Sequence, residues 1–129
     1  MDTKVKLASY NVRGLKNDKK RRELFSYMVA QKYDIVCLQE THCEAVNRKV
    51  WEKDWKGKIF HSFGTNRSKG CAILINETMT TKNFQAQENL ENGRIVKIEF
   101  ENDDEKKYYI LCVYAPNDGD ERKTFFNRM

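Results

Sequence analysis

The ten residues from Tyr33 to His42 constrain the fold of this chain more than any other stretch. Ile35 to Leu38 form an unbroken apolar run, which predicts a central strand buried on both faces. A carboxylate, Glu40, follows this run with no Gly or Pro before it. Burying a carboxylate is costly unless it is paired or binds a metal, so this strand must end at the surface or at a cation. Ligands bind at the carboxyl ends of strands in open α/β sheets, which makes Glu40 a candidate site residue.

Two further stretches have the same form, an apolar strand followed by a polar residue and a loop. Residues 7–15 contain Asn11 at the end of such a strand, and residues 108–119 lead through Tyr114 into a Pro-Asn turn at Asn117. If the three strands share one sheet, one edge of that sheet carries four candidate site residues: Asn11, Glu40, Tyr114 and Asn117.

The remaining patterns predict alternating helices and strands in one domain. A strand is expected over residues 4–10, a helix beginning near Asn17 or Asp18, and a second helix over residues 44–55 with Trp51 and Trp55 in the core. Paired strands are expected over residues 58–63 and 71–75, followed by irregular structure over 76–93. An alternating strand should then begin at Gly93, with Val96, Ile98 and Phe100 on one face. A buried strand over 108–114 and a final helix from Asp118 complete the expected elements.

The net charge is positive, with 24 Lys and Arg against 19 Asp and Glu, giving +5 and a pI near 9.0. This balance favours polyanionic partners such as nucleic acid or anionic lipid. The basic run at residues 19–22 is expected to be a solvated helix face rather than a DNA contact. The loop from Gly64 to Gly70 holds Arg67 and Lys69, which form either a solvated hairpin or contacts to a phosphate backbone.

The four cysteines contain no C-x-x-C pair and have no histidine spaced for zinc, so they are expected to be reduced core residues. The start of the chain, Met1 to Lys6, lacks the apolar region of a signal peptide, and no stretch is long enough to cross a bilayer. We therefore expect a nuclear or cytoplasmic protein that is not secreted and has no membrane partner. The sequence leaves the oligomeric state open.

Four segments occur together in one order along the chain: Ser9–Leu15, Asp34–His42, Gly70–Ile75 and Val113–Asn117. Together they resemble the endonuclease/exonuclease/phosphatase (DNase I-like) superfamily, and most of all the apurinic-type endonuclease domain of non-LTR (LINE) retrotransposons. Repair apurinic endonucleases usually carry Asp and Lys where this chain has Arg13 and His42. These two residues therefore favour the retrotransposon branch.

The resemblance implies a DNase I-like four-layer α/β sandwich, of which this chain would form roughly the first half, a mixed sheet with flanking helices. It also implies divalent-metal-dependent hydrolysis of phosphodiesters in DNA. By this resemblance, Glu40 binds Mg²⁺ or Mn²⁺ with Asn11 beside it, and Tyr114 and Asn117 line the pocket for the scissile phosphate. The candidate nucleic-acid contacts are Arg13, Arg67 and Lys69. Asp34 is excluded, because six residues of strand place it about 20 Å from Glu40.

The resemblance also has a gap. The family completes its site with a later Asp-x-Asn motif, a further Asp and a final Ser-Asp-His, and this sequence contains none of them. Residues 1–129 are therefore expected to be a partial domain, truncated at the C-terminus, without its general base and slow or inactive alone. The absent part is also expected to supply the second sheet, so that an apolar sheet face lies exposed here. The alternatives are a catalytically dead remnant that binds nucleic acid or protein, and a phosphatase.

Overall fold

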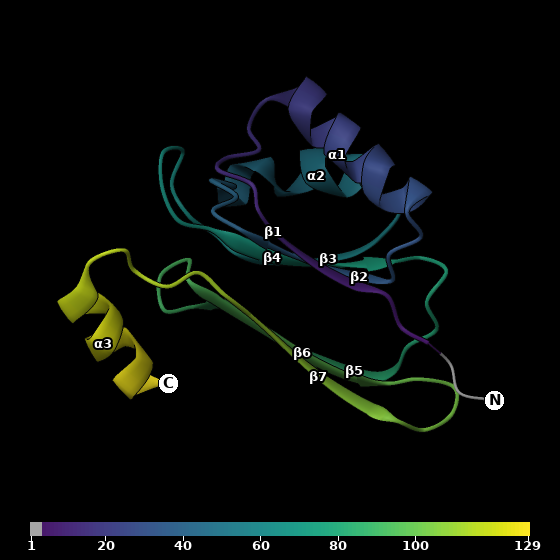
Figure 1. Ribbon diagram of the computed structural model, residues 1–129. Helices are drawn as coiled ribbons and strands as arrows, with labels where there is room; N and C mark the ends of the chain where they lie inside the picture. Colours follow the sequence, from purple (N-terminus) through teal and green to yellow (C-terminus); the bar gives the residue numbers. More distant parts are fainter. Residues whose placement is uncertain (1–3) are drawn as a thin grey trace.

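The computed structural model describes residues 4–129, and Figure 1 traces the chain through them. The prediction that the chain lacks a signal peptide was based on Met1 to Lys6, and the first three of these residues lie outside this range. The elements in chain order are β1 (Leu7–Asn11), α1 (Asp18–Ala30), β2 (Ile35–Gln39), the short 3₁₀ helix η1 (Ala45–Asn47), α2 (Arg48–Asp54), β3 (Gly57–Ser62), β4 (Cys71–Asn76), β5 (Lys82–Leu90), β6 (Ile95–Glu101), β7 (Lys107–Val113) and α3 (Gly119–Arg128).

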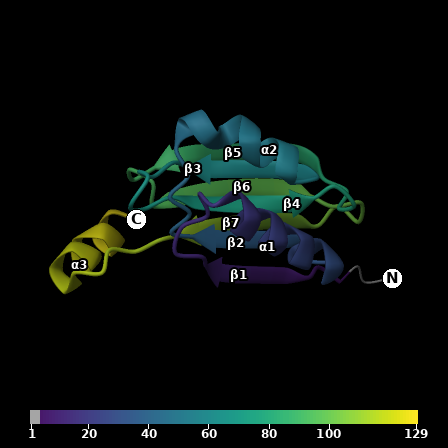
Figure 2. The same cartoon turned by 90° about the horizontal axis from the view of Figure 1, so that it is seen from above.

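The strands form two sheets that stack face to face. The four-stranded sheet has the order β1-β2-β4-β3, with β1 parallel to β2 and the other pairs antiparallel. The three-stranded sheet is the antiparallel meander β5-β6-β7. Helices α1 and α2 cover the outer face of the four-stranded sheet, and α3 stands at one end of the molecule (Figures 1 and 2).

The predicted central strand is confirmed, because β2 is buried on both faces. Val36 and Leu38 pack toward the helices, while Ile35 and Cys37 pack toward the second sheet. Its neighbour β4 behaves in the same way and is buried along its whole length. Both strands therefore read as continuous apolar runs rather than as alternating ones.

The expectation that an absent part supplies the second sheet is wrong. The three-stranded sheet already covers the inner face of the four-stranded one, through a core that includes Ile73, Val96 and Phe100. The outer face of the three-stranded sheet is the exposed one. There β7 alternates rather than being buried, with Tyr109 69% exposed and Leu111 45% exposed.

The expectation of irregular structure over residues 76–93 is also wrong, because β5 occupies nine of these residues. This strand lies at a sheet edge and has two register shifts against β6. Asn83 and Asn89 adopt positive φ angles there, which asparagine tolerates better than most residues. The register shifts remove the period-2 pattern by which a strand is predicted. The Glu88 and Asn89 side chains accept hydrogen bonds from backbone N–H groups of residues 61 and 63, in and just after β3.

Polar side chains begin both long helices, as predicted. Asn17 accepts a hydrogen bond from the Lys20 N–H, and Asp118 accepts two from the first turn of α3. The basic run in α1 is not a purely solvated face, however. Arg21 is 2% exposed and donates two hydrogen bonds to Asp54, at 2.7 and 3.0 Å. Burial is tolerated because this cation is paired.

The helix-side core contains both predicted tryptophans and one buried histidine. Trp51 and Trp55 are 1% and 3% exposed and contact Phe25 edge to face. His61 stacks on Phe63 and meets the edge of Trp51. Within residues 4–129, neither ring nitrogen of His61 finds a hydrogen-bond partner. Burial, aided by the charge of Arg48, lowers the pKa of His61 to about 3.

All four cysteines are buried free thiols, as predicted. Within residues 4–129, no helix is both long and apolar enough to span a membrane.

We expect His61 to make the fold acid-sensitive. The unfolded chain protonates this imidazole near pH 6.5 and the folded chain only near pH 3, so its stabilising contribution is complete above pH 6.5 and falls toward pH 3. Between urea unfolding at pH 7 and at pH 5.5, the unfolding free energy of the wild type should fall by about 1.3 kcal/mol more than that of His61→Leu. Equal pH dependence in the two proteins would contradict this.

Candidate functional site

Five connections meet at one end of the two sheets, on the left in Figure 1. They are the segments that follow β1 and β2, the β3–β4 loop, the β5–β6 turn and the segment that follows β7. Backbone hydrogen bonds join the first two: the Gly14 N–H donates to the Glu40 carbonyl at 2.7 Å, and the Leu15 N–H to the Thr41 carbonyl at 3.0 Å. The end of the fold that carries the sequence motifs is therefore also a continuous hydrogen-bonded unit.

Gly70 joins the loops of one sheet to the other sheet. Its carbonyl accepts from the Thr41 N–H at 2.9 Å, and its own N–H donates to the Gly93 carbonyl at 2.9 Å. Gly70 has a φ of +93°, and a Cβ at this position would lie 2.3 Å from the Thr41 hydroxyl oxygen. Only glycine therefore fits this junction without displacement of its neighbours.

Left-handed backbone is concentrated in these connections. Glu40 has a φ of 56° immediately after the buried strand β2, so the chain turns sharply and carries the carboxylate out of the sheet. Positive φ angles are unfavourable for side-chain-bearing residues and persist where surrounding contacts enforce them. The other residues with positive φ in these connections are Arg13, Gly14, His42, Lys69, Gly70, Asn92, Gly93 and Glu91.

The centre of the candidate site is a contact between the two sheets. The Tyr114 hydroxyl, beyond the end of β7, donates a hydrogen bond to Glu40 Oε1 at 3.2 Å. The condition set from the sequence, that the three strands share one sheet, is not met, because β7 belongs to the three-stranded sheet. Glu40 and Tyr114 meet nevertheless, because the sheets stack and both connections leave at the same end.

The two asparagines extend this contact on either side. Asn11 ends β1 directly beside Gln39 of β2, and its side-chain oxygen accepts from the Arg13 N–H at 3.2 Å. Asn117 follows the buried Pro116, and its side chain lowers the pKa of the Tyr114 hydroxyl. The structure thus joins Tyr114 directly to Glu40 and places Asn117 three residues after Tyr114. Asn11 comes just before the connection in which the Gly14 N–H donates to the Glu40 carbonyl.

Sequence reasoning missed Arg94, which contacts Tyr114 from the other side. Its guanidinium lies 5.4 Å from the centre of the Tyr114 ring. Burial raises the pKa of the Tyr114 hydroxyl, and the charge and hydrogen bond of Glu40 raise it further, whereas Arg94 and Asn117 lower it. The net result is a raised pKa, so the phenol stays protonated and donates. Arg94 follows a turn glycine, but its pairing with Tyr114 depends on hairpin register, which the sequence pattern leaves open.

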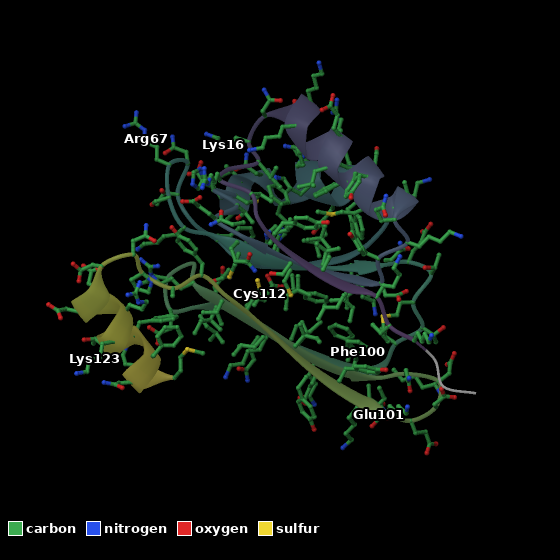
Figure 3. All side chains as sticks on the ribbon, in the orientation of Figure 1. Lys16, Arg67, Phe100, Glu101, Cys112 and Lys123 are labelled. Carbon is green, nitrogen blue, oxygen red and sulfur yellow. The ribbon has the colours of Figure 1, made fainter. Side chains whose placement is uncertain are left out.

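The three predicted nucleic-acid contacts occupy different places. Arg67 is exposed at the tip of the β3–β4 loop, where Figure 3 shows it pointing away from the body of the protein. Arg13 is exposed in the connection after β1. Lys69 is half-buried and lines a hollow of about 410 Å³ together with Arg94, Pro116 and residues of α3.

The donor chemistry of Glu40 and Asn11 fits a magnesium ion. Both offer oxygen, the ligand that this hard cation prefers, and magnesium commonly binds one or two carboxylates while keeping several waters. Glu40 Oε1 accepts from Tyr114, which leaves Oε2 for an ion. Across residues 4–129, no group of three or more His, Cys, Asp or Glu side chains could hold a metal. Glu40 and Asn11 therefore match magnesium in the type of ligand atom, and they supply a small number of protein donors.

Neither histidine has the environment of an accessible general base. His61 belongs to the helix-side core. His42 has its Nε2 buried, with no hydrogen-bond partner among the described residues, and its Nδ1 lies 2.7 Å from the position that a Cβ on Gly14 would occupy. This imidazole therefore packs against the turn after β1.

Comparison with known proteins gives a consistent result. The sequence profile of the Endonuclease/Exonuclease/phosphatase family matches residues 8–125. The uncharacterized 149 kDa protein of transposon TX1 from Xenopus laevis is 26% identical over 125 residues, which cover 97% of this chain and 9% of that protein. An exodeoxyribonuclease from Bacillus subtilis (strain 168) is 26% identical over 116 residues, 88% of this chain and 43% of that protein. The chain thus spans less than half the length of these curated relatives.

Solved structures of low sequence identity share the fold. The AP endonuclease LMAP from Leishmania major superposes with a TM-score of 0.68 at 20% identity, covering 89% of this chain and 41% of that one. TDP2 from D. rerio, complexed with a single-strand DNA product, superposes with a TM-score of 0.69 at 18% identity, covering 98% and 53%. The predicted DNase I-like fold is therefore confirmed.

We expect Gly70→Ala to destabilise the fold by about 2–4 kcal/mol, because the added methyl group strains the backbone and collides with Thr41. The matched control is Gly119→Ala, since a Cβ there meets nothing within 4 Å and lies at the first residue of α3. That variant should be neutral or more stable by about 0.5 kcal/mol. Urea denaturation measures both, and equal losses would refute the role of Gly70.

Proposed function

We propose, from its membership of the endonuclease/exonuclease/phosphatase family, that this chain carries a site for divalent-metal-dependent hydrolysis of phosphodiesters in DNA, of the retrotransposon endonuclease type. The observation that carries the proposal is the hydrogen bond from Tyr114 to Glu40 across the two sheets. It gathers a carboxylate, a phenol that stays protonated and neighbouring amides at one end of the fold. A phosphodiester offers the anionic oxygens that such donors and a bound cation recognise.

Each residue has a separate role in this proposal. Glu40 and Asn11 hold Mg²⁺, or Mn²⁺ in its place, which when bound would neutralise charge on the phosphate. Tyr114 and Asn117 donate hydrogen bonds to phosphate oxygens at the edge of the same site. Arg13, Arg67 and Lys69 bind the polynucleotide backbone through charge, so their contribution should weaken as salt rises.

Residues that activate water are not among those gathered at this site. His61 lies in the core and His42 packs against Gly14. Positioned general acids and bases typically contribute 10²- to 10⁴-fold to such reactions. We therefore propose that residues 1–129, as a partial domain, hydrolyse DNA slowly or not at all by themselves, while keeping the metal-dependent part of DNA binding.

Two alternatives give different results in solution. A catalytically dead remnant, favoured by the small number of protein metal donors, would bind nucleic acid or protein without any metal dependence. A phosphatase would hydrolyse a small phosphate monoester such as p-nitrophenyl phosphate. The exposed cation of the β3–β4 loop favours the polynucleotide substrate over the small one.

We expect Mg²⁺ to tighten the binding of a fluorescent DNA duplex by this chain at fixed ionic strength. Glu40→Gln should abolish that increase, because it removes the carboxylate charge while keeping the side-chain size. Fluorescence anisotropy measures the affinity, and any nicking of supercoiled plasmid in parallel assays should require both Mg²⁺ and Glu40.

The matched control is Glu99→Gln, which removes one carboxylate from β6 on the outer face of the three-stranded sheet. It should bind and respond to Mg²⁺ as the wild type does. If DNA binding is the same with Mg²⁺ and with EDTA, the proposed metal site is wrong and the remnant explanation holds.

A further inference from the structure

Arg94 and Tyr114 form a pair that extends the hairpin of β6 and β7 by one residue. The last registered pair of these strands is Ile95 with Val113. Beyond it, the Tyr114 N–H donates to the Arg94 carbonyl at 2.8 Å. The backbone of Tyr114 is thus fixed by the residue directly opposite it in the meander.

The Arg94 side chain then folds back over the same tyrosine. Its Nη1 donates to the Tyr114 carbonyl at 3.2 Å, and its guanidinium lies over the Tyr114 ring. One side chain therefore holds both the carbonyl and the ring of Tyr114. An arginine suits this task, because its planar group stacks on an aromatic face while its N–H groups donate in the plane.

This pair is held at both ends. On one side, the Tyr114 hydroxyl reaches Glu40 in the other sheet. On the other side, Arg94 belongs to the β5–β6 turn, where its N–H donates to the Leu90 carbonyl and the preceding Gly93 carbonyl accepts from Gly70. The direction of the phenol is thus coupled to the junction that joins the sheets.

Arg94 also changes the charge around the phenol. Glu40 places a negative charge beside the Tyr114 hydroxyl, and Arg94 places a positive one over its ring. Arg94 also lines the hollow next to the site together with Lys69. A cation at this position offsets the repulsion that Glu40 would exert on an approaching phosphate.

We propose that Arg94 is a positioning residue of the candidate site, which holds the Tyr114 hydroxyl on Glu40 and balances the carboxylate charge beside it. The effect of Arg94 on phosphodiester binding rests on the function proposed above, whereas its role in positioning Tyr114 does not. The two claims can therefore be tested separately.

The test is the ¹³C NMR spectrum at neutral pH of the protein with tyrosines labelled at Cζ, with the Tyr114 signal assigned from Tyr114→Phe. Arg94→Gln should shift the Tyr114 signal, because it removes the guanidinium that lies over the ring and donates to the Tyr114 carbonyl. Arg94→Lys keeps the positive charge but not the planar group, so its Tyr114 signal should lie closer to the wild-type position than that of Arg94→Gln. Lys97→Gln, which removes one exposed cation from β6, should leave the Tyr114 signal unchanged.

The variants also separate position from charge. Loss of the stacked guanidinium should move the Tyr114 ¹³C signal at neutral pH in both Arg94→Gln and Arg94→Lys, because lysine cannot form the planar contact. Identical Tyr114 signals in the wild type and Arg94→Gln would overturn the proposal. If these shifts appear but Mg²⁺ does not tighten DNA binding, the positioning role stands and the proposed function fails.

Discussion

The hydrogen bonds of Gly70 are the constraint on which the candidate site depends. This residue accepts from the connection after β2 and donates to the β5–β6 turn, so it fixes one sheet against the other at the end where the motifs lie. Two buried strands, β2 and β4, supply the rigid base, since each packs against helices on one face and against the second sheet on the other. The Glu40 carboxylate and the Tyr114 phenol meet only because this base and this junction hold the stacked sheets in register.

The cost of this arrangement lies in the backbone. Glu40, Lys69 and Arg13 all adopt left-handed conformations that residues with side chains normally avoid. The hydrogen bonds between the connections compensate for the free energy of these backbone conformations. As a result, polar side chains project outward at the ends of strands that are otherwise apolar. At the opposite end, a row of stacked rings runs from Phe60 through Phe84 and Phe100 to Tyr108. The Lys58 ammonium lies over the Phe84 ring, and the Asn102 side chain donates to the Tyr108 hydroxyl.

The sequence predicts those parts of the fold that depend on local patterns. The apolar run of β2, the caps at Asn17 and Asp118, and the paired strands β3 and β4 are all found where the patterns place them. The edge strand β5 was missed because its bulges and outward polar residues remove the period on which strand prediction relies. The assignment of β7 to a second sheet and the pairing of Arg94 with Tyr114 depend on tertiary packing and on hairpin register, which local patterns do not encode. The pattern of an apolar strand followed by a polar residue singled out Asn11, Glu40, Tyr114 and Asn117. Their chemical roles came from the family resemblance and are proposals.

The central claim is that Glu40, with Asn11 beside it, binds a divalent cation at the junction of the two sheets. The most direct measurement is paramagnetic line broadening of backbone amides in the ¹⁵N-labelled chain on addition of Mn²⁺. The account predicts that amides near Glu40, Gly70 and Tyr114 broaden together, that excess Mg²⁺ reverses the effect, and that Glu40→Gln abolishes it. Broadening confined to the acidic turn at residues 102–105, between β6 and β7, or unchanged by Glu40→Gln, would contradict it.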